Sequence, residues 1–222
     1  MLIPSGTLVR NLTFQSNDLG RETTILLVFD ANVEGLCGTI YPVVWKTFTF
    51  PKTGSSSFEV TYTNDLAFFT ADIEDENVIR TFTKFKLKPG QKTTLSLKNE
   101  SDTLSFSPPV DGTSGCLTAE NKTGLVQDLA VGFFASSYFT ANEPVPALFF
   151  KEVEDGSNAT IQWKPVLRVY IESGYRETEV LVDAISSTAI WEHDLHQLFR
   201  NTTLNLERNR ITGRCTLKKT KP

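Results

Sequence analysis

The chain has 222 residues, 40% of them apolar and 11% aromatic, and its 22 basic and 26 acidic side chains give a net charge of −4. This length suits one large β-sandwich or barrel with a sizeable core, so we expect a single domain over residues 1–222. Because the chain is acidic and lacks a basic stripe along most of its length, its composition argues against a nucleic-acid partner.

The start of the chain and the cysteines bear on the cellular compartment. Residues 1–6 lack the basic and apolar regions of a signal peptide, and no apolar run approaches the ~20 residues of a transmembrane segment. Cys37, Cys116 and Cys215 form no CxxC pair. These features predict a cytoplasmic protein. N-glycosylation sequons favour the alternative, a secreted protein, and they begin at Asn11, Asn99, Asn121, Asn158 and Asn201.

Short apolar or alternating segments, separated by Gly, Pro, Asn and Ser, predict an all-β protein, an antiparallel β-sandwich. The predicted strands are residues 7–14, 23–29, 45–50, 57–63, 84–87, 93–97, 126–134, 147–153, 159–163, 167–172, 177–185, 203–207 and 214–218. The run at 25–29 is apolar on both faces, so we expect a central strand that is covered on both sides.

Two alternating segments, 167–172 and 177–185, flank Ser173-Gly174. This pattern predicts a hairpin with a two-residue turn, in which Arg168 lies opposite Glu179. A turn at Gly174-Tyr175 would instead shift every cross-strand pair.

One short helix is predicted in the C-terminal half, at about residues 189–200. Trp191, Leu195, Leu198 and Phe199 recur there at helical spacing and would form its apolar face. The only two histidines, His193 and His196, also lie on this segment. Imidazoles three residues apart share a helix face and suit zinc or copper, but a tight site needs a third protein ligand. A solvated polar face is the simpler interpretation, and the metal ligands stay unassigned.

The sequence has no recognisable catalytic motif. Neither GxGxxG, GxxxxGK[ST] nor GxSxG occurs, and serine or cysteine catalysis would have to use the two histidines of the predicted helix. The acidic stretch 72–76 lacks the spacing of a calcium loop, which favours a solvated loop. We therefore expect no enzyme. A hydrolase with two carboxylates far apart in the sequence stays open, because it requires no local pattern, and it ranks last of the alternatives.

Aromatic residues are abundant, with 16 Phe, 5 Tyr and 3 Trp. Most should form the core. Trp45, Trp163 and Trp191 each stand beside polar residues near the end of a predicted element, where an indole ring can line a cleft and stack on a flat ligand or a sugar. Core packing is the alternative for each. The aromatic cluster within residues 133–139 is predicted to be exposed.

The segments TFPKTGSSSFEVTY (49–62), KPGQKTTL (88–95) and PVLRVYIES (165–173) carry a resemblance that extends over most of the chain. The sequence resembles the family of pink chromoproteins from the fruiting bodies of oyster mushrooms. The resemblance implies a β-sandwich similar in shape to actinoporin-like fungal lectins, which acts as a non-enzymatic pigment carrier. It implies a small organic chromophore as the ligand, and it admits magnesium or another divalent metal as a further component. The candidate ligand-binding residues are Trp45, Trp163, Tyr170, Trp191, His193 and His196.

The alternative function is a carbohydrate-binding defence lectin or a membrane-active, cytolysin-like protein. A pore former of the actinoporin type needs an amphipathic N-terminal segment, whereas residues 7–14 predict a strand, which disfavours lysis. Exposed edge strands favour a homodimer. The basic residues near the C-terminus suit acidic ligands or anionic lipid, although a solvated terminal strand is the simpler interpretation.

Overall fold

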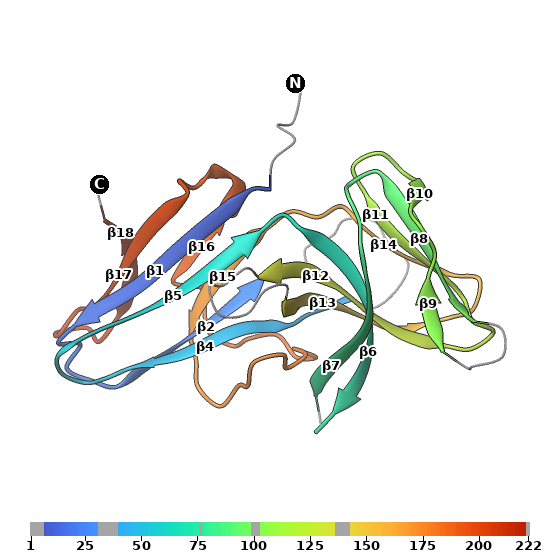
Figure 1. The fold of residues 1–222 in the computed structure, drawn as a ribbon. Coiled ribbons are helices and arrows are strands. Elements are labelled where there is room, and N and C mark those ends of the chain that lie inside the picture. Colours follow the sequence, from blue (N-terminus) through green and yellow to red (C-terminus); the bar gives the residue numbers. More distant parts are fainter. Residues whose placement is uncertain (1–6, 31–39, 76, 99–102, 136–142, 221–222) are drawn as a thin grey trace.

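The computed structural model describes residues 7–30, 40–75, 77–98, 103–135 and 143–220. Within these ranges nearly all regular structure is β-strand, arranged in four sheets that we name A to D (Figure 1). Sheets A and B face each other on the left of Figure 1, and sheets C and D pack together on the right. The all-β, sandwich-like fold predicted from the sequence is confirmed.

Sheets A and B have four strands each. In order across sheet A, the strands are β18 (Cys215–Lys219), β17 (Asn201–Arg208), β1 (Val9–Asn17) and β5 (Ser55–Thr63). In order across sheet B, they are β16 (Trp191–Asp194), β15 (Val166–Ile171), β2 (Thr23–Phe29) and β4 (Val44–Phe50). Neighbouring strands are antiparallel, except that β1 and β17 run parallel.

Sheets C and D have five strands each. In order across sheet C, the strands are β3 (Ile40–Pro42), β13 (Glu143–Val153), β12 (Gln127–Ala135), β6 (Leu66–Glu74) and β7 (Val78–Lys86). In order across sheet D, they are β10 (Val110–Asp111), β8 (Gln91–Leu97), β11 (Leu117–Lys122) and β14 (Asn158–Ile161), with β9 (Leu104–Phe106) also paired to β8. The pair β8 and β11 is parallel.

Strand β2 occupies the centre of sheet B, between β15 and β4, as its apolar sequence predicts. Its side chains alternate between two buried clusters. Ile25 and Leu27 enter the main core, which sheet A covers, whereas Leu26 and Val28 belong to a smaller cluster on the opposite face. Residues from segment 172–190 complete this smaller cluster. The strand is therefore covered on both sides, and the second cover comes from a connection rather than from a sheet.

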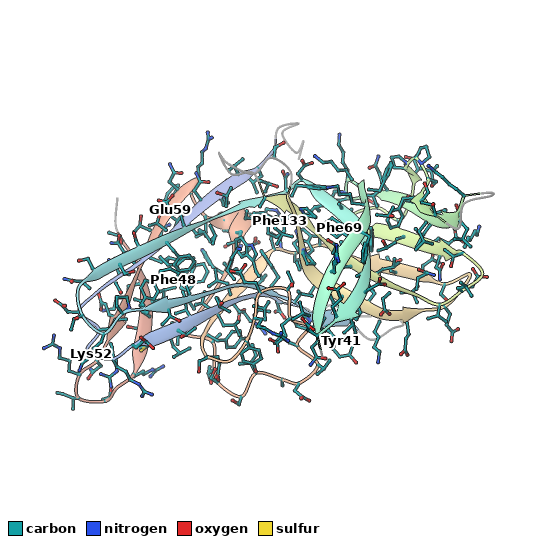
Figure 2. The ribbon with its side chains drawn as sticks, turned by 60° about the horizontal axis from the view of Figure 1, so that its bottom comes forward. Tyr41, Phe48, Lys52, Glu59, Phe69 and Phe133 are labelled. Atoms are coloured by element: carbon teal, nitrogen blue, oxygen red, sulfur yellow. The ribbon has the colours of Figure 1, made fainter. Side chains whose placement is uncertain are left out.

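The main core contains residues from all four sheets, and five aromatic rings meet where the A/B and C/D halves join. The ring centroid of Phe29 lies between 5.2 and 5.9 Å from those of Trp45, Tyr62, Phe133 and Trp163. Figure 2 shows Phe133 at this junction. Tilted and edge-to-face rings at such distances add to the stability that burial itself provides.

The hairpin predicted at 173–174 is wrong. Strand β15 pairs with β2 and β16, whereas residues 177–185 form only isolated bridges, to Val43 and to Val78. Arg168 therefore lies opposite Glu192 of β16 rather than opposite Glu179. An isolated two-stranded hairpin is marginally stable in water. Pairing along the apolar strand β2 gives β15 both hydrogen bonds and buried surface.

The helix predicted at 189–200 is also wrong. Strand β16 forms there instead, and a 3₁₀ helix, η1 (Leu195–Gln197), follows it. Leu195 and Leu198 are buried, but Phe199 is 67% exposed. The apolar spacing of a short segment is compatible with a helix or a strand. Here the free edge of β15 offers backbone hydrogen bonds, and this pairing overrides the helical preference. Among the described residues, no helix has the length and apolar character required to cross a membrane.

Candidate functional site

Two of the predicted ligand residues, Trp45 and Trp163, are placed in the core, with 4% and 9% of their surface exposed. Trp163 Nε1 donates a hydrogen bond of 3.0 Å to Tyr62 Oη. Burial raises the pKa of Tyr62 well above its usual range. The two polar atoms satisfy each other inside the core. This pairing explains how indole and phenol groups are accommodated there without a ligand.

Trp191 and His193 lie on β16, where their ring centroids are 5.7 Å apart in an edge-to-face contact. His196 instead lies in η1, and its backbone N–H donates to the Asp194 carboxylate at 2.8 Å. The proposed metal site required a helix face shared by both histidines, and that helix is absent. Within the described ranges, no group of three or more His, Cys, Asp or Glu side chains is placed to hold a metal ion.

Tyr170 lines a pocket of about 540 Å³ on the outer face of sheet B, which we call the sheet B pocket. One wall comes from β2 and β15, and the other from segment 172–190, which runs below β2 and β4 in Figure 1. The apolar lining includes Val28, Pro42, Leu181, Val182 and Ile185. The polar lining consists of Asp30, Arg168, Asp183, Ser187, Thr188 and Glu192, in addition to the Tyr170 hydroxyl.

Two carboxylates hold Arg168 in the wall of this pocket. Arg168 Nη2 lies 2.8 Å from Asp30 Oδ2, and Nε lies 2.9 Å from Glu192 Oε2. Burial alone would lower the pKa of Arg168, but Asp30 and Glu192 outweigh this effect and raise it. The guanidinium is therefore charged and fixed in orientation, as charge-assisted pairs of this geometry are. The Ser187 hydroxyl is buried and has no hydrogen-bond partner among the described residues.

Among its described residues, the lining pairs no serine or cysteine nucleophile with a base. No histidine or cysteine is among the described lining residues. Serine nucleophiles need an adjacent base, and the Ser187 hydroxyl has no such partner in the described part of the chain. The pocket is partly open, and its lining combines apolar surface with polar groups, as small-molecule sites do.

Sequence reasoning identified one residue of this pocket, Tyr170, and missed the others. The sequence of segment 172–190 predicts a hairpin strand and the start of a helix, and neither element would line a pocket. One signal was available. Strand β2 is apolar on both faces, and Leu26 and Val28 point away from the main core. Apolar side chains on that face require a second layer that covers the outer face of sheet B.

The structure describes only parts of the aromatic cluster at 133–139 and of the acidic stretch at 72–76. Phe133 and Phe134 are 0% and 4% exposed, so the prediction of an exposed cluster is wrong for them, and residues 136–142 lie outside the described residues. The acidic stretch is solvated as predicted, but residues 72–74 are the exposed end of strand β6 rather than a loop, and Glu74 pairs there with Arg80 at 3.5 Å.

The placement of the three tryptophans predicts their accessibility in solution. Because Trp45 and Trp163 are buried and Trp191 is half-buried, we expect iodide to quench the fluorescence of Trp191 far more than that of the other two. The Trp191→Phe variant should lose most of the iodide-sensitive emission, while Trp45→Phe should retain it. Loss of the quenchable emission in Trp45→Phe would mean that a cleft reaches this indole.

Comparison of the chain with protein-family models, with curated proteins and with solved structures finds no significant match.

Proposed function

We propose that this protein is a non-enzymatic carrier of a small conjugated organic chromophore, which it holds in the sheet B pocket. The observation that carries the proposal is the pocket's combination of size, apolar walls and fixed polar groups. Its volume of about 540 Å³ is within the range of small-molecule sites. The resemblance to pigment-binding proteins supports the same ligand class.

A flat conjugated ligand would use both walls of the pocket. Tyr170 offers an aromatic ring on one wall, and Leu181 and Ile185 offer aliphatic surface on the other. Aromatic rings favour offset stacking or edge contacts with such a ligand.

The charges of the pocket narrow the ligand class further. The lining contains three acidic side chains, Asp30, Asp183 and Glu192, and one cationic side chain, Arg168. Its net charge is therefore negative. Such a lining favours a neutral or cationic chromophore over an anionic one. The fixed Arg168 guanidinium can orient a carbonyl or phenol oxygen at one end of the ligand.

The proposal is tested by spectroscopy on the full chain. Protein purified from its natural source is expected to carry a visible absorption band that follows the protein through purification. In recombinant protein, Nile red, a neutral conjugated dye, is expected to bind at one equivalent with a rise in fluorescence. Ala184→Trp, which places an indole in the pocket, should weaken Nile red binding at least about tenfold, as expected when an occupied pocket is filled.

Ser186→Trp is the matched control, because Ser186 is exposed on the same segment but does not line the pocket. We expect this variant to bind Nile red as the unchanged protein does. A colourless natural protein, or equal Nile red affinity in both tryptophan variants, would refute the proposal. Dialysis of the coloured protein against a chelator then distinguishes a purely organic ligand from one that a divalent metal assists.

A further inference from the structure

Three connecting loops meet at the end of the A/B half that points away from sheets C and D (Figure 1). They are the connections at residues 18–22, 51–54 and 209–214. Gly20 N donates a hydrogen bond of 2.8 Å to the Lys52 carbonyl, and Gly54 N donates one of 2.7 Å to the Asp18 carboxylate. Figure 2 shows Lys52 at the tip of this end. The first two loops are therefore fixed to each other without a ligand.

Unpaired positive charge gathers at this end of a chain whose net charge is −4. The cationic side chains are Arg21, Lys52, Arg208, Arg210 and Arg214. None of them forms an ion pair with a described acidic side chain. Three acids lie at the same end: Asp18 and Glu207, which line the hollows, and Glu22 of the first loop. Glu207 pairs with Lys218 at 2.6 Å and Asp18 accepts the hydrogen bond from Gly54, so the five cations outnumber the three acids.

Two adjoining hollows of about 720 and 480 Å³ lie at this end and share Asp18, Arg208 and Arg210; together we call them the basic hollow. The lining of the larger one is rich in amide and hydroxyl side chains, including Gln15, Asn17, Ser55, Ser57 and Asn205. Ser16 also lines it, is 6% exposed, and has a hydroxyl without a hydrogen-bond partner among the described residues. No aromatic side chain is among the described lining residues of either hollow.

We infer that the basic hollow binds an oligosaccharide that carries sulfate or carboxylate groups. Guanidinium groups donate two parallel hydrogen bonds to such oxyanions. Amide and hydroxyl side chains both donate and accept hydrogen bonds, which matches the hydroxyl groups of sugar rings. An anionic oligosaccharide needs both kinds of partner, and the basic hollow places them side by side.

Single-stranded nucleic acid is a poorer fit to the same charges, because its binding sites usually provide aromatic rings on which bases stack. The basic hollow lies at the loop end of the A/B half, whereas the sheet B pocket lies on the outer face of sheet B and shares no lining residue with it. This inference therefore stands apart from the proposed chromophore site, and a failure of either leaves the other intact.

The test measures binding of a heparin-derived tetrasaccharide to the full chain by calorimetry, with neutral chitotetraose as the second probe. The double variant Lys52→Gln/Arg210→Gln changes two exposed side chains of the hollow, so the fold should be kept. We expect it to bind the heparin tetrasaccharide at least about tenfold more weakly, because two charge-assisted contacts are lost. Chitotetraose should bind the unchanged protein more weakly than the heparin probe.

The control is Lys88→Gln/Lys98→Gln, which removes the same charge from exposed positions beside sheet D. It is expected to change the affinity by less than about twofold, because the distance exceeds the range of screened charges. Equal losses in both double variants would overturn the inference, as would tighter binding of chitotetraose. Equally tight binding of a single-stranded oligonucleotide of matched charge, or of anionic lipid vesicles, would also overturn it, since the end would then be a general polyanion surface.

Discussion

Gly132→Ala is expected to lower the free energy of unfolding by at least about 3 kcal/mol, at the upper end of what overpacking a core costs. Gly132 lies in β12, next to an irregularity in its pairing with β13. A Cβ atom at this position would lie 1.9 Å from the Val145 carbonyl oxygen and 2.9 Å from its carbon. These are backbone atoms in the middle of sheet C, so no side-chain rotation relieves the overlap. The two strands would have to separate locally.

Urea denaturation followed by far-ultraviolet circular dichroism measures this loss. Gly156→Ala is the matched control, because a Cβ atom at Gly156 meets nothing within 4 Å and only its φ of 78° opposes the change. The left-handed backbone there should cost about 1 kcal/mol. If Gly132→Ala costs no more than Gly156→Ala, the close approach of β12 and β13 does not exist in solution.

The sequence was most informative where burial is regular along a strand. In β2 every residue from Ile25 to Phe29 is apolar, and in β5 and β17 polar and apolar residues alternate, so both patterns identified strands. Strand β6 was missed. Its first six residues are all buried and the exposed acidic stretch follows directly. The strand therefore shows no alternation of polar and apolar residues. The sequence predicts the wrong type of element where pairing with a distant strand determines the structure. The residues of β16 have helical spacing, yet they form the edge strand of sheet B.

The candidate sites were harder to foresee than the fold. The sheet B pocket joins Val28 on β2 to Leu181 on an irregular segment, and no local pattern connects positions so far apart. Tyr170, a candidate ligand-binding residue, does line this pocket. Trp45 and Trp163 are candidates because each stands beside polar residues near the end of a predicted strand, yet the structure places both in the core. Residue type alone does not separate a ring that lines a pocket from one that fills a core.

Phe29→Ala tests whether Trp45 and Trp163 fill a rigid core or line a cavity. We expect this substitution to lower the free energy of unfolding by about 4 kcal/mol. The Phe29 side chain is fully buried, and its ring neighbours Trp45 at 5.2 Å and Trp163 at 5.6 Å. Its removal leaves a cavity surrounded by rings that belong to different sheets. Such rings cannot close the cavity without moving the sheets, so little of the loss is recovered by relaxation.

Phe82→Ala is the control for this experiment, since Phe82 is 47% exposed and its ring lies beneath the Arg80 guanidinium. We expect this substitution to cost less than about 1 kcal/mol in the same urea titration, because little buried surface is lost. A cost for Phe29→Ala as small as that for Phe82→Ala would mean that the rings do not form one rigid core. Trp45 and Trp163 would then be free to line a ligand cavity, and the chromophore would have to be sought at the junction of the four sheets instead of in the sheet B pocket.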